Sequence, residues 1–88
     1  MKAIVTVIGK DKTGIIAAVS GELSRLNANI EDISQTVMRD YFVMMMMCDV
    51  SKSEEIASIA QKLTDLGKKI GVDIRIQHED IFNSMHKV

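Results

Sequence analysis

The segment Tyr41–Val50 constrains the possible folds of this chain more than any other stretch. It reads Tyr-Phe-Val-Met-Met-Met-Met-Cys-Asp-Val. Successive side chains of a β-strand point to opposite faces of its sheet. One face then carries Phe42, Met44, Met46, Cys48 and Val50, and the other carries Val43, Met45 and Met47. Because both faces are apolar, we expect this strand to lie in the middle of a sheet.

Hydrophobic periodicity along the chain predicts the order strand, helix, strand, strand, helix, strand. The strands are expected over about residues 2–8, 30–38, 41–50 and 72–77, and the helices over about residues 14–26 and 54–67. Residues 27–29 end the first helix, because asparagine adopts the left-handed conformation readily. Ser51 or Ser53 is the expected cap of the second helix, and Gly67 its expected end.

This order of elements predicts an α+β fold, a ferredoxin-like βαββαβ sandwich with a four-stranded antiparallel sheet and two helices on one face. The first and third strands take the central positions, and the polar second strand is the expected edge. Met45 and Met47 then lie on the face without helices. Two interpretations of these methionines stay open. A second copy of the chain covers them, or they simply fill a core strand because methionine adapts its shape.

The size and charge of the chain narrow the classes of function. Its 88 residues predict one domain, 1–88, whose tail (81–88) includes one helical turn that brings Ile81, Phe82 and Met85 against an apolar surface. The net charge of −1 gives no sign of a basic surface, so nucleic-acid binding is not expected. The single cysteine, Cys48, is expected to be a small buried apolar residue. A lone cysteine without a disulfide partner indicates a reducing compartment. Without a signal peptide or a long apolar run, a soluble cytoplasmic protein is expected.

The loop between the first strand and the first helix is the candidate binding site. It runs from Gly9 through Lys10, Asp11, Lys12 and Thr13 to Gly14. Unpaired backbone N–H groups of Thr13, Gly14 and Ile15 at the helix start favour an anion such as a carboxylate, and Lys10 or Lys12 adds positive charge. The alternative is a strand-to-helix turn in which Asp11 and Thr13 cap the helix and the lysines are solvated.

The glycine-bracketed loop followed by Ile15-Ile16, together with Asn29-Ile30 after the helix, resembles the ACT domain family. Residues 78–86, His-Glu-Asp-Ile-Phe-Asn-Ser-Met-His, are similar to the tail of its stand-alone members. Those members are similar to the paired ACT domains of the glycine-cleavage repressor. The resemblance implies a non-enzymatic, cofactor-free regulatory domain. It implies a homodimer or higher homo-oligomer that binds an amino acid or similar small molecule near the subunit interface. Aligned on the loop glycine, Asp11 and Asn29 match the positions that hold the ligand in serine-sensing members.

The resemblance and the loop chemistry together give the candidate ligand-binding set. It consists of Gly9, Lys10, Asp11, Lys12, Thr13, Gly14, Ile15, Asn29 and Ile30. Within it, Asp11 and the Asn29 carboxamide are expected to meet the ligand's amino group. The alternative role of Asn29 is a turn residue that satisfies its own backbone.

Other kinds of site fit the sequence less well. Cys48 lacks the second cysteine of a metal-binding pair, and His78 and His86 are poorly spaced as metal ligands. The aromatic pair needed for RNA stacking is missing. An acylphosphatase-like enzyme would need an arginine in the loop, which offers lysines only. A protein-interaction module that acts through a regulated partner, without a ligand, remains an alternative.

Overall fold

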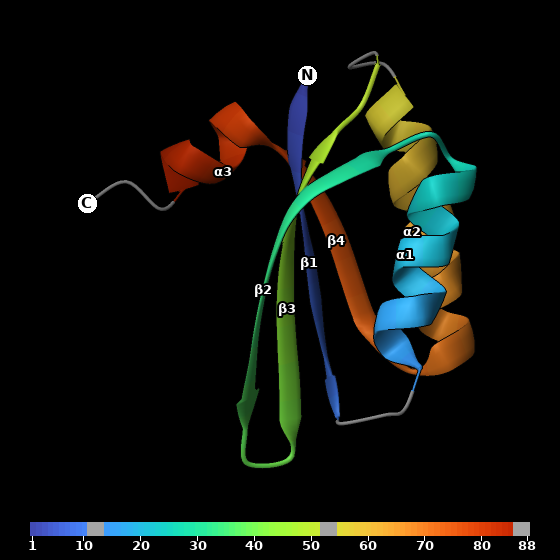
Figure 1. The fold of residues 1–88 in the computed structure, drawn as a ribbon, viewed down its shortest axis with the longest axis vertical. Coiled ribbons are helices and arrows are strands. Elements are labelled where there is room, and N and C mark those ends of the chain that lie inside the picture. The colour runs from blue at the N-terminus through green and yellow to red at the C-terminus, as the bar shows by residue number, and fades with distance from the viewer. Residues whose placement is uncertain (11–13, 52–54, 86–88) are drawn as a thin grey trace.

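Four strands form one antiparallel sheet, and helices α1 and α2 lie together on one side of it (Figure 1). The computed structural model describes residues 1–10, 14–51 and 55–85. The elements are β1 (Lys2–Lys10), α1 (Ile15–Arg25), β2 (Asn29–Met38), β3 (Tyr41–Asp49), α2 (Ile56–Ile70), β4 (Asp73–His78) and α3 (Glu79–Met85). The predicted βαββαβ order is confirmed, and α3 follows it on the other side of the sheet (Figure 1).

The strand order across the sheet is β2-β3-β1-β4. The two strands with apolar residues on both faces, β1 and β3, are central, and the polar strand β2 lies at an edge, as the sequence predicted. Val5 of β1 pairs with Met46 of β3, and residues on either side continue this antiparallel register. Helices α1 and α2 cover one face only, so the two faces of the central strands meet different surroundings.

The core lies between the sheet and the two covering helices. It is built from Val5 and Val7 on β1, Val19 and Leu23 on α1, Leu63 on α2, and Met44, Met46 and Cys48 on β3, all fully buried. The alternation predicted for the methionine run is therefore correct. Met44 and Met46 fill the core, whereas Met45 and Met47 are half-buried on the opposite face.

A β-bulge interrupts the pairing of β2 with β3. Ile30 pairs with Cys48 and Asp32 pairs with Met47, so Glu31 is an extra residue in the edge strand. The bulge shifts the alternation, so Ile30 and Ile33 both lie on the helix side although they are three residues apart. Ile30 thereby packs against the core.

The ends of α2 differ from the prediction. The residue at the N-cap is Glu55, whose side chain makes no capping hydrogen bond; Ser53 lies outside the described residues. The helix continues through Gly67 and ends at Gly71, which has a φ of 78°. The N–H groups of Gly71 and Val72 donate to the Gly67 carbonyl at 2.7 and 2.9 Å, so the chain turns four residues later than predicted.

Cys48 is buried among apolar side chains, and this burial raises the pKa of its thiol to about 11. We expect iodoacetamide at pH 8 to alkylate the folded protein about 100-fold more slowly than the urea-unfolded chain, because each pKa unit changes the thiolate fraction tenfold. Mass spectrometry after timed quenching measures both rates. Equal rates in the two states would contradict the buried position of the thiol.

Candidate functional site

Helix α1 begins beside the end of β1 at a glycine corner. Gly14, the residue before the helix, has a φ of 90°, a conformation that strains any other residue. Its carbonyl accepts the first helical hydrogen bond, from Ala18 N–H at 2.9 Å. Ile15 is buried and anchors the first turn. The predicted site residues Asp11, Lys12 and Thr13 lie outside the described residues.

Two predicted loop residues are instead part of β1. Gly9 pairs with Phe42 and Lys10 pairs with Tyr41, so the strand runs two residues further than expected. Gly9 also has a packing role. A Cβ atom at this position would lie 2.5 Å from Cγ1 of Val72, at the start of β4. The glycine is required there by the close approach of Val72, which accounts for it without a ligand.

The other predicted site residues, Asn29 and Ile30, lie at the far end of α1. The helix ends with a left-handed Asn27 at φ 59°. Asn27 N–H donates to the Ser24 carbonyl at 3.1 Å, and Ala28 N–H donates to the Leu23 carbonyl at 2.9 Å. This pair of bonds is a Schellman motif, and it fixes the direction in which β2 leaves the helix.

A hollow of about 430 Å³ lies where the chain passes from the end of α1 into β2. It is lined by Ser20, Ser24, Asn27, Ala28, Asn29 and Ile30. The lining offers hydroxyl and carboxamide groups and no formal charge, and it stands at the helix end that carries partial negative charge. Sequence analysis identified Asn29 and Ile30 but missed the two serines. Their spacing of four residues places both on one stripe of α1, and Asn27 follows in the turn after the helix.

The glycine corner and the Asn29 end of the hollow lie at opposite ends of α1. The 11 residues of the helix separate Gly14 from the turn that leads to Asn29, which at 1.5 Å per residue is about 16 Å. Figure 1 shows β1 ending near the start of α1 at the lower end of the molecule, and β2 starting at the upper end. Asn29 and the glycine corner are therefore at opposite ends of α1 within one chain.

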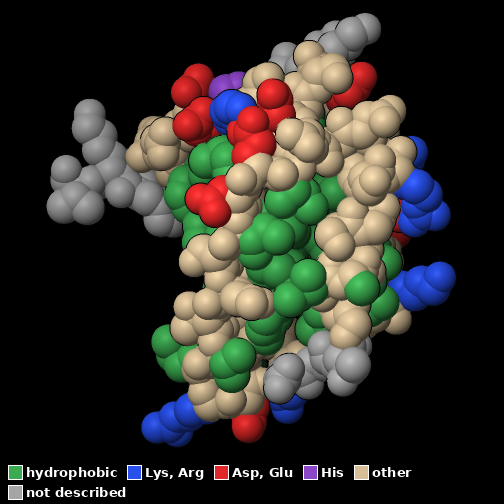
Figure 2. Space-filling model, in the orientation of Figure 1, with side chains coloured by type: hydrophobic (Ala, Val, Ile, Leu, Met, Phe, Trp, Pro, Cys, Tyr) green, Lys and Arg blue, Asp and Glu red, His purple; other side chains and the backbone are tan. Residues whose placement is uncertain are grey.

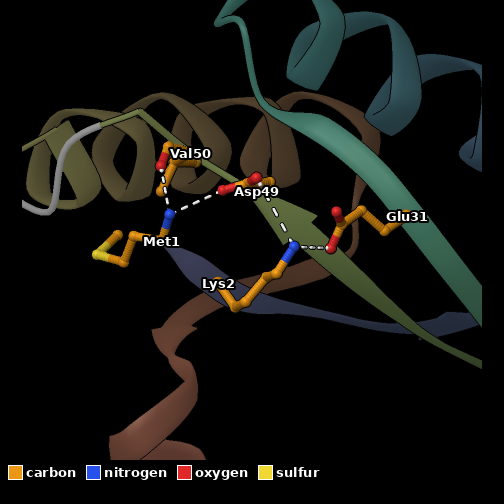
Figure 3. A network of polar contacts seen from close by, with 5 residues as sticks. All are labelled: Met1, Lys2, Glu31, Asp49 and Val50. Atoms are coloured by element: carbon orange, nitrogen blue, oxygen red, sulfur yellow. Dashed lines mark hydrogen bonds and ion pairs between the residues drawn. The ribbon is translucent and has the colours of Figure 1, made fainter.

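A polar network ties together the end of the sheet next to the hollow (Figure 3). The Met1 amino group donates to Asp49 Oδ1 at 2.8 Å and to the Val50 carbonyl at 3.1 Å. Lys2 Nζ bonds to the carboxylate of Glu31, the bulge residue, and lies 3.7 Å from Asp49 Oδ2. The hydrogen bond from Met1 lowers the pKa of Asp49, and the bond to Glu31 raises that of Lys2. These contacts join β1, β2 and β3 around Asn29, which pairs with Asp49.

Exposed apolar side chains lie between the glycine corner and the hollow, on α1 and β2. Figure 2 shows hydrophobic side chains gathered along the middle of this face, between edge strand β2 and the helices. Ile33 and Val37 lie on the helix side of β2 and are 43% and 61% exposed; Ile16 on α1 is 41% exposed. We call this surface, made of Ile16, Ile33 and Val37, the α1/β2 groove.

Two observations concern the part of the chain that the structure describes. None of its histidine, cysteine and acidic residues gather into a group of three that could hold a metal ion. None of the helices in that part is long and apolar enough to cross a membrane.

A family model described as the ACT domain matches residues 2–77. The chain belongs to the ACT domain family. It is 53% identical to the UPF0237 protein of Listeria innocua over 89 aligned positions, covering 100% of both chains. An ACT domain protein from Streptococcus pneumoniae is 43% identical and has a TM-score of 0.85, with 98% of each chain covered.

A structure attributed to a glycine cleavage system transcriptional repressor aligns with 89% of this ACT domain and 47% of its own chain. Its TM-score is 0.76 at 21% identity, which shows a shared fold. ACT domains are commonly regulatory domains that bind small molecules. The ferredoxin-like fold predicted from the sequence agrees with this membership.

Proposed function

We propose that this ACT domain is a regulatory domain that binds a free amino acid between two copies of the chain. The observation that carries the proposal is the placement of the glycine corner and of the Asn29 end of the hollow at opposite ends of α1, with the apolar α1/β2 groove between them. We take the corner and the hollow as the two halves of one site. A molecule built in this way has a complete site only when a second copy supplies the missing half.

A two-fold axis perpendicular to the sheet, placed beside β2, achieves this. Such an axis sets β2 antiparallel to the β2 strand of the partner and α1 antiparallel to its α1. The glycine corner of each chain then meets the hollow of the other, and Ile16, Ile33 and Val37 are buried between them. An isologous interface of this kind yields two equivalent sites.

The helix ends suit the charges of an amino acid. The Ile15 N–H group at the start of α1 is positively polarised and suits a carboxylate. The end of the partner's α1 is negatively polarised, and the oxygens of Ser24 and Asn29 there accept hydrogen bonds from an ammonium group. A zwitterion therefore fits between the two helix ends in one orientation.

Thermal-shift measurements against the twenty amino acids, run beside sedimentation equilibrium, test the proposal. We expect sedimentation to show a dimer or a larger assembly. We expect one or a few amino acids to raise its melting temperature, because ligands that bind the native state stabilise it. Asn29→Ala should lower the affinity for that amino acid about tenfold or more, because the variant loses a hydrogen bond to a charged group. The matched control Asn83→Ala changes an exposed asparagine of α3 and should leave affinity unchanged.

Interface variants separate assembly from binding. Val37→Glu places a charge in the α1/β2 groove and should reduce both the assembly mass and amino-acid binding, whereas Ser58→Glu on the exposed side of α2 should change neither. Full ligand affinity in a monomeric Val37→Glu protein would refute the shared site. Hydrolysis of an acyl phosphate that is lost in Lys10→Ala would instead support the enzymatic alternative.

A further inference from the structure

The wall of the hollow on the β2 side is the short segment of residues 27–30, and this segment is held at both ends. At the helix end, the two hydrogen bonds of the Schellman motif fix it to α1. At the strand end, the next residue is Glu31, the extra residue of the bulge. The positions of Asn29 and Ile30 in the hollow therefore depend on what holds the bulge in place.

The bulge reconciles the sequence of β2 with the apolar core. Without an extra residue, regular alternation would place Asp32 on the same face as Ile30, which packs against the core. A carboxylate in those surroundings is costly. With the bulge, Asp32 pairs with Met47 on the opposite face, and Ile30 keeps its contact with the core. The insertion leaves Glu31 outside the regular pairing of β2 with β3.

Lys2 reaches the bulge from two strands away. Strand β3 lies between β1 and β2, and neighbouring strands are about 5 Å apart, so a contact between β1 and β2 spans about 10 Å. Lys2 pairs with Asp49, which pairs with Asn29 on its other side. Figure 3 shows the Lys2 ammonium group between the carboxylates of Asp49 and Glu31. The Lys2 and Glu31 side chains are 39% and 34% exposed, so water reaches them only in part.

The charges make Lys2 more than one half of an ion pair. Its ammonium group bonds to Glu31 of β2 and lies 3.7 Å from the Asp49 carboxylate of β3. Two carboxylates that face one cation repel each other once that cation is removed. The Met1 amino group, which bonds to Asp49 at 2.8 Å, would then be the remaining cation of the network drawn in Figure 3. Lys2 thus attracts the bulge and offsets its repulsion from β3.

We propose that Lys2 and Glu31 are positioning residues of the hollow. Their contact across β3 holds the bulge, and the bulge holds Asn29 and Ile30 against the serines of α1. This placement does not depend on which molecule the hollow binds. Its consequence for affinity rests on the proposed function, because a displaced Asn29 no longer meets the ammonium group of an amino acid.

Hydrogen exchange of the ligand-free protein tests the placement. Lys2→Gln and Glu31→Gln should each speed amide exchange in residues 29–33 about two- to fivefold relative to residues 4–7 of β1, the usual contribution of a partly exposed ion pair. The double variant should exchange no faster than Lys2→Gln alone, because both changes remove the same contact. The matched control Arg75→Gln removes an ion pair at the opposite edge of the sheet and should leave residues 29–33 unchanged.

Variants of different length separate reach from charge. Glu31→Asp keeps the charge but is one methylene shorter, so it should behave like Glu31→Gln, whereas Lys2→Arg keeps both and should behave like the native chain. Circular dichroism checks that each variant is folded. Amino-acid affinity should fall about two- to fivefold in the same variants that exchange faster.

The two measurements separate the two proposals. Native exchange in residues 29–33 of both Lys2→Gln and Glu31→Gln would overturn the positioning role, and it would leave the amino-acid site intact. Failure of the native chain to bind any amino acid would overturn the proposed function. Faster exchange in the two variants would still support the positioning role in that case, because this measurement uses no ligand.

Discussion

Replacing Met46 with alanine is expected to lower the free energy of unfolding by about 2–5 kcal/mol, the range for truncating a large buried side chain. Met46 is fully buried between the sheet and the helices, and it belongs to the core cluster. A loss of this size is a large fraction of the stability of a small domain. Urea unfolding followed by circular dichroism, at one fixed protein concentration, measures the change.

Met47 is the matched control for Met46, because it is the next residue in the chain and has the same side chain. It lies half-buried on the face of the sheet opposite α1 and α2. Met47→Ala should therefore cost clearly less than Met46→Ala, since part of its surface is already in contact with water. If the two variants lost the same free energy of unfolding, Met46 and Met47 could not lie on opposite faces of the sheet as described.

Replacing Gly67 with alanine is expected to destabilise the protein by about 1–3 kcal/mol, the usual cost of overpacking. Alanine is ordinarily the better helix former by about 1 kcal/mol. At this position, however, a Cβ atom would lie 2.5 Å from the carbonyl oxygen of Val72, and a backbone atom cannot move aside as a side chain can. Chemical unfolding measures the change and its sign.

Two control variants isolate the cause of the Gly67 effect. Gly21 lies in α1, and a Cβ atom there would meet nothing within 4 Å, so Gly21→Ala should stabilise the protein by about 0.5–1 kcal/mol. Adding Val72→Ala should reduce the destabilisation caused by Gly9→Ala, because the added Cβ of that variant meets the Val72 side chain. It should not reduce the destabilisation caused by Gly67→Ala, whose added Cβ meets the Val72 backbone. Stabilisation by Gly67→Ala would show that α2 and the start of β4 are further apart than described.

The fold was predictable because its main signals are local and strong. The apolar character of both faces of β3 placed that strand in the centre, and the polar residues of β2 placed it at an edge. The end of α2 was not predictable in the same way. Gly67 and Gly71 are both possible helix ends by residue type, and apolar periodicity does not distinguish them. In the structure Gly71 adopts the left-handed conformation, and the N–H groups of Gly71 and Val72 donate to the Gly67 carbonyl.

The local geometry of the candidate region was partly predictable from the sequence, whereas the lining of the hollow was not. The corner at Gly14 and the turn after α1 were identified, but Gly9 and Lys10 belong to β1. Ser20 and Ser24 were not predicted to line the hollow, because serines at this spacing are typical of the solvated side of a helix. Their place on the hollow depends on how the Schellman turn at Asn27 directs β2, which is geometry that the residue types alone do not specify.

The bulge at Glu31 has a further consequence for how the edge of the sheet behaves toward other chains. An exposed edge strand invites uncontrolled strand addition, which leads to aggregation. The extra residue breaks the regular pattern of donors and acceptors between Ile30 and Asp32. A foreign strand can therefore extend the sheet only along Asp32–Met38, so indiscriminate polymerisation through this edge is disfavoured.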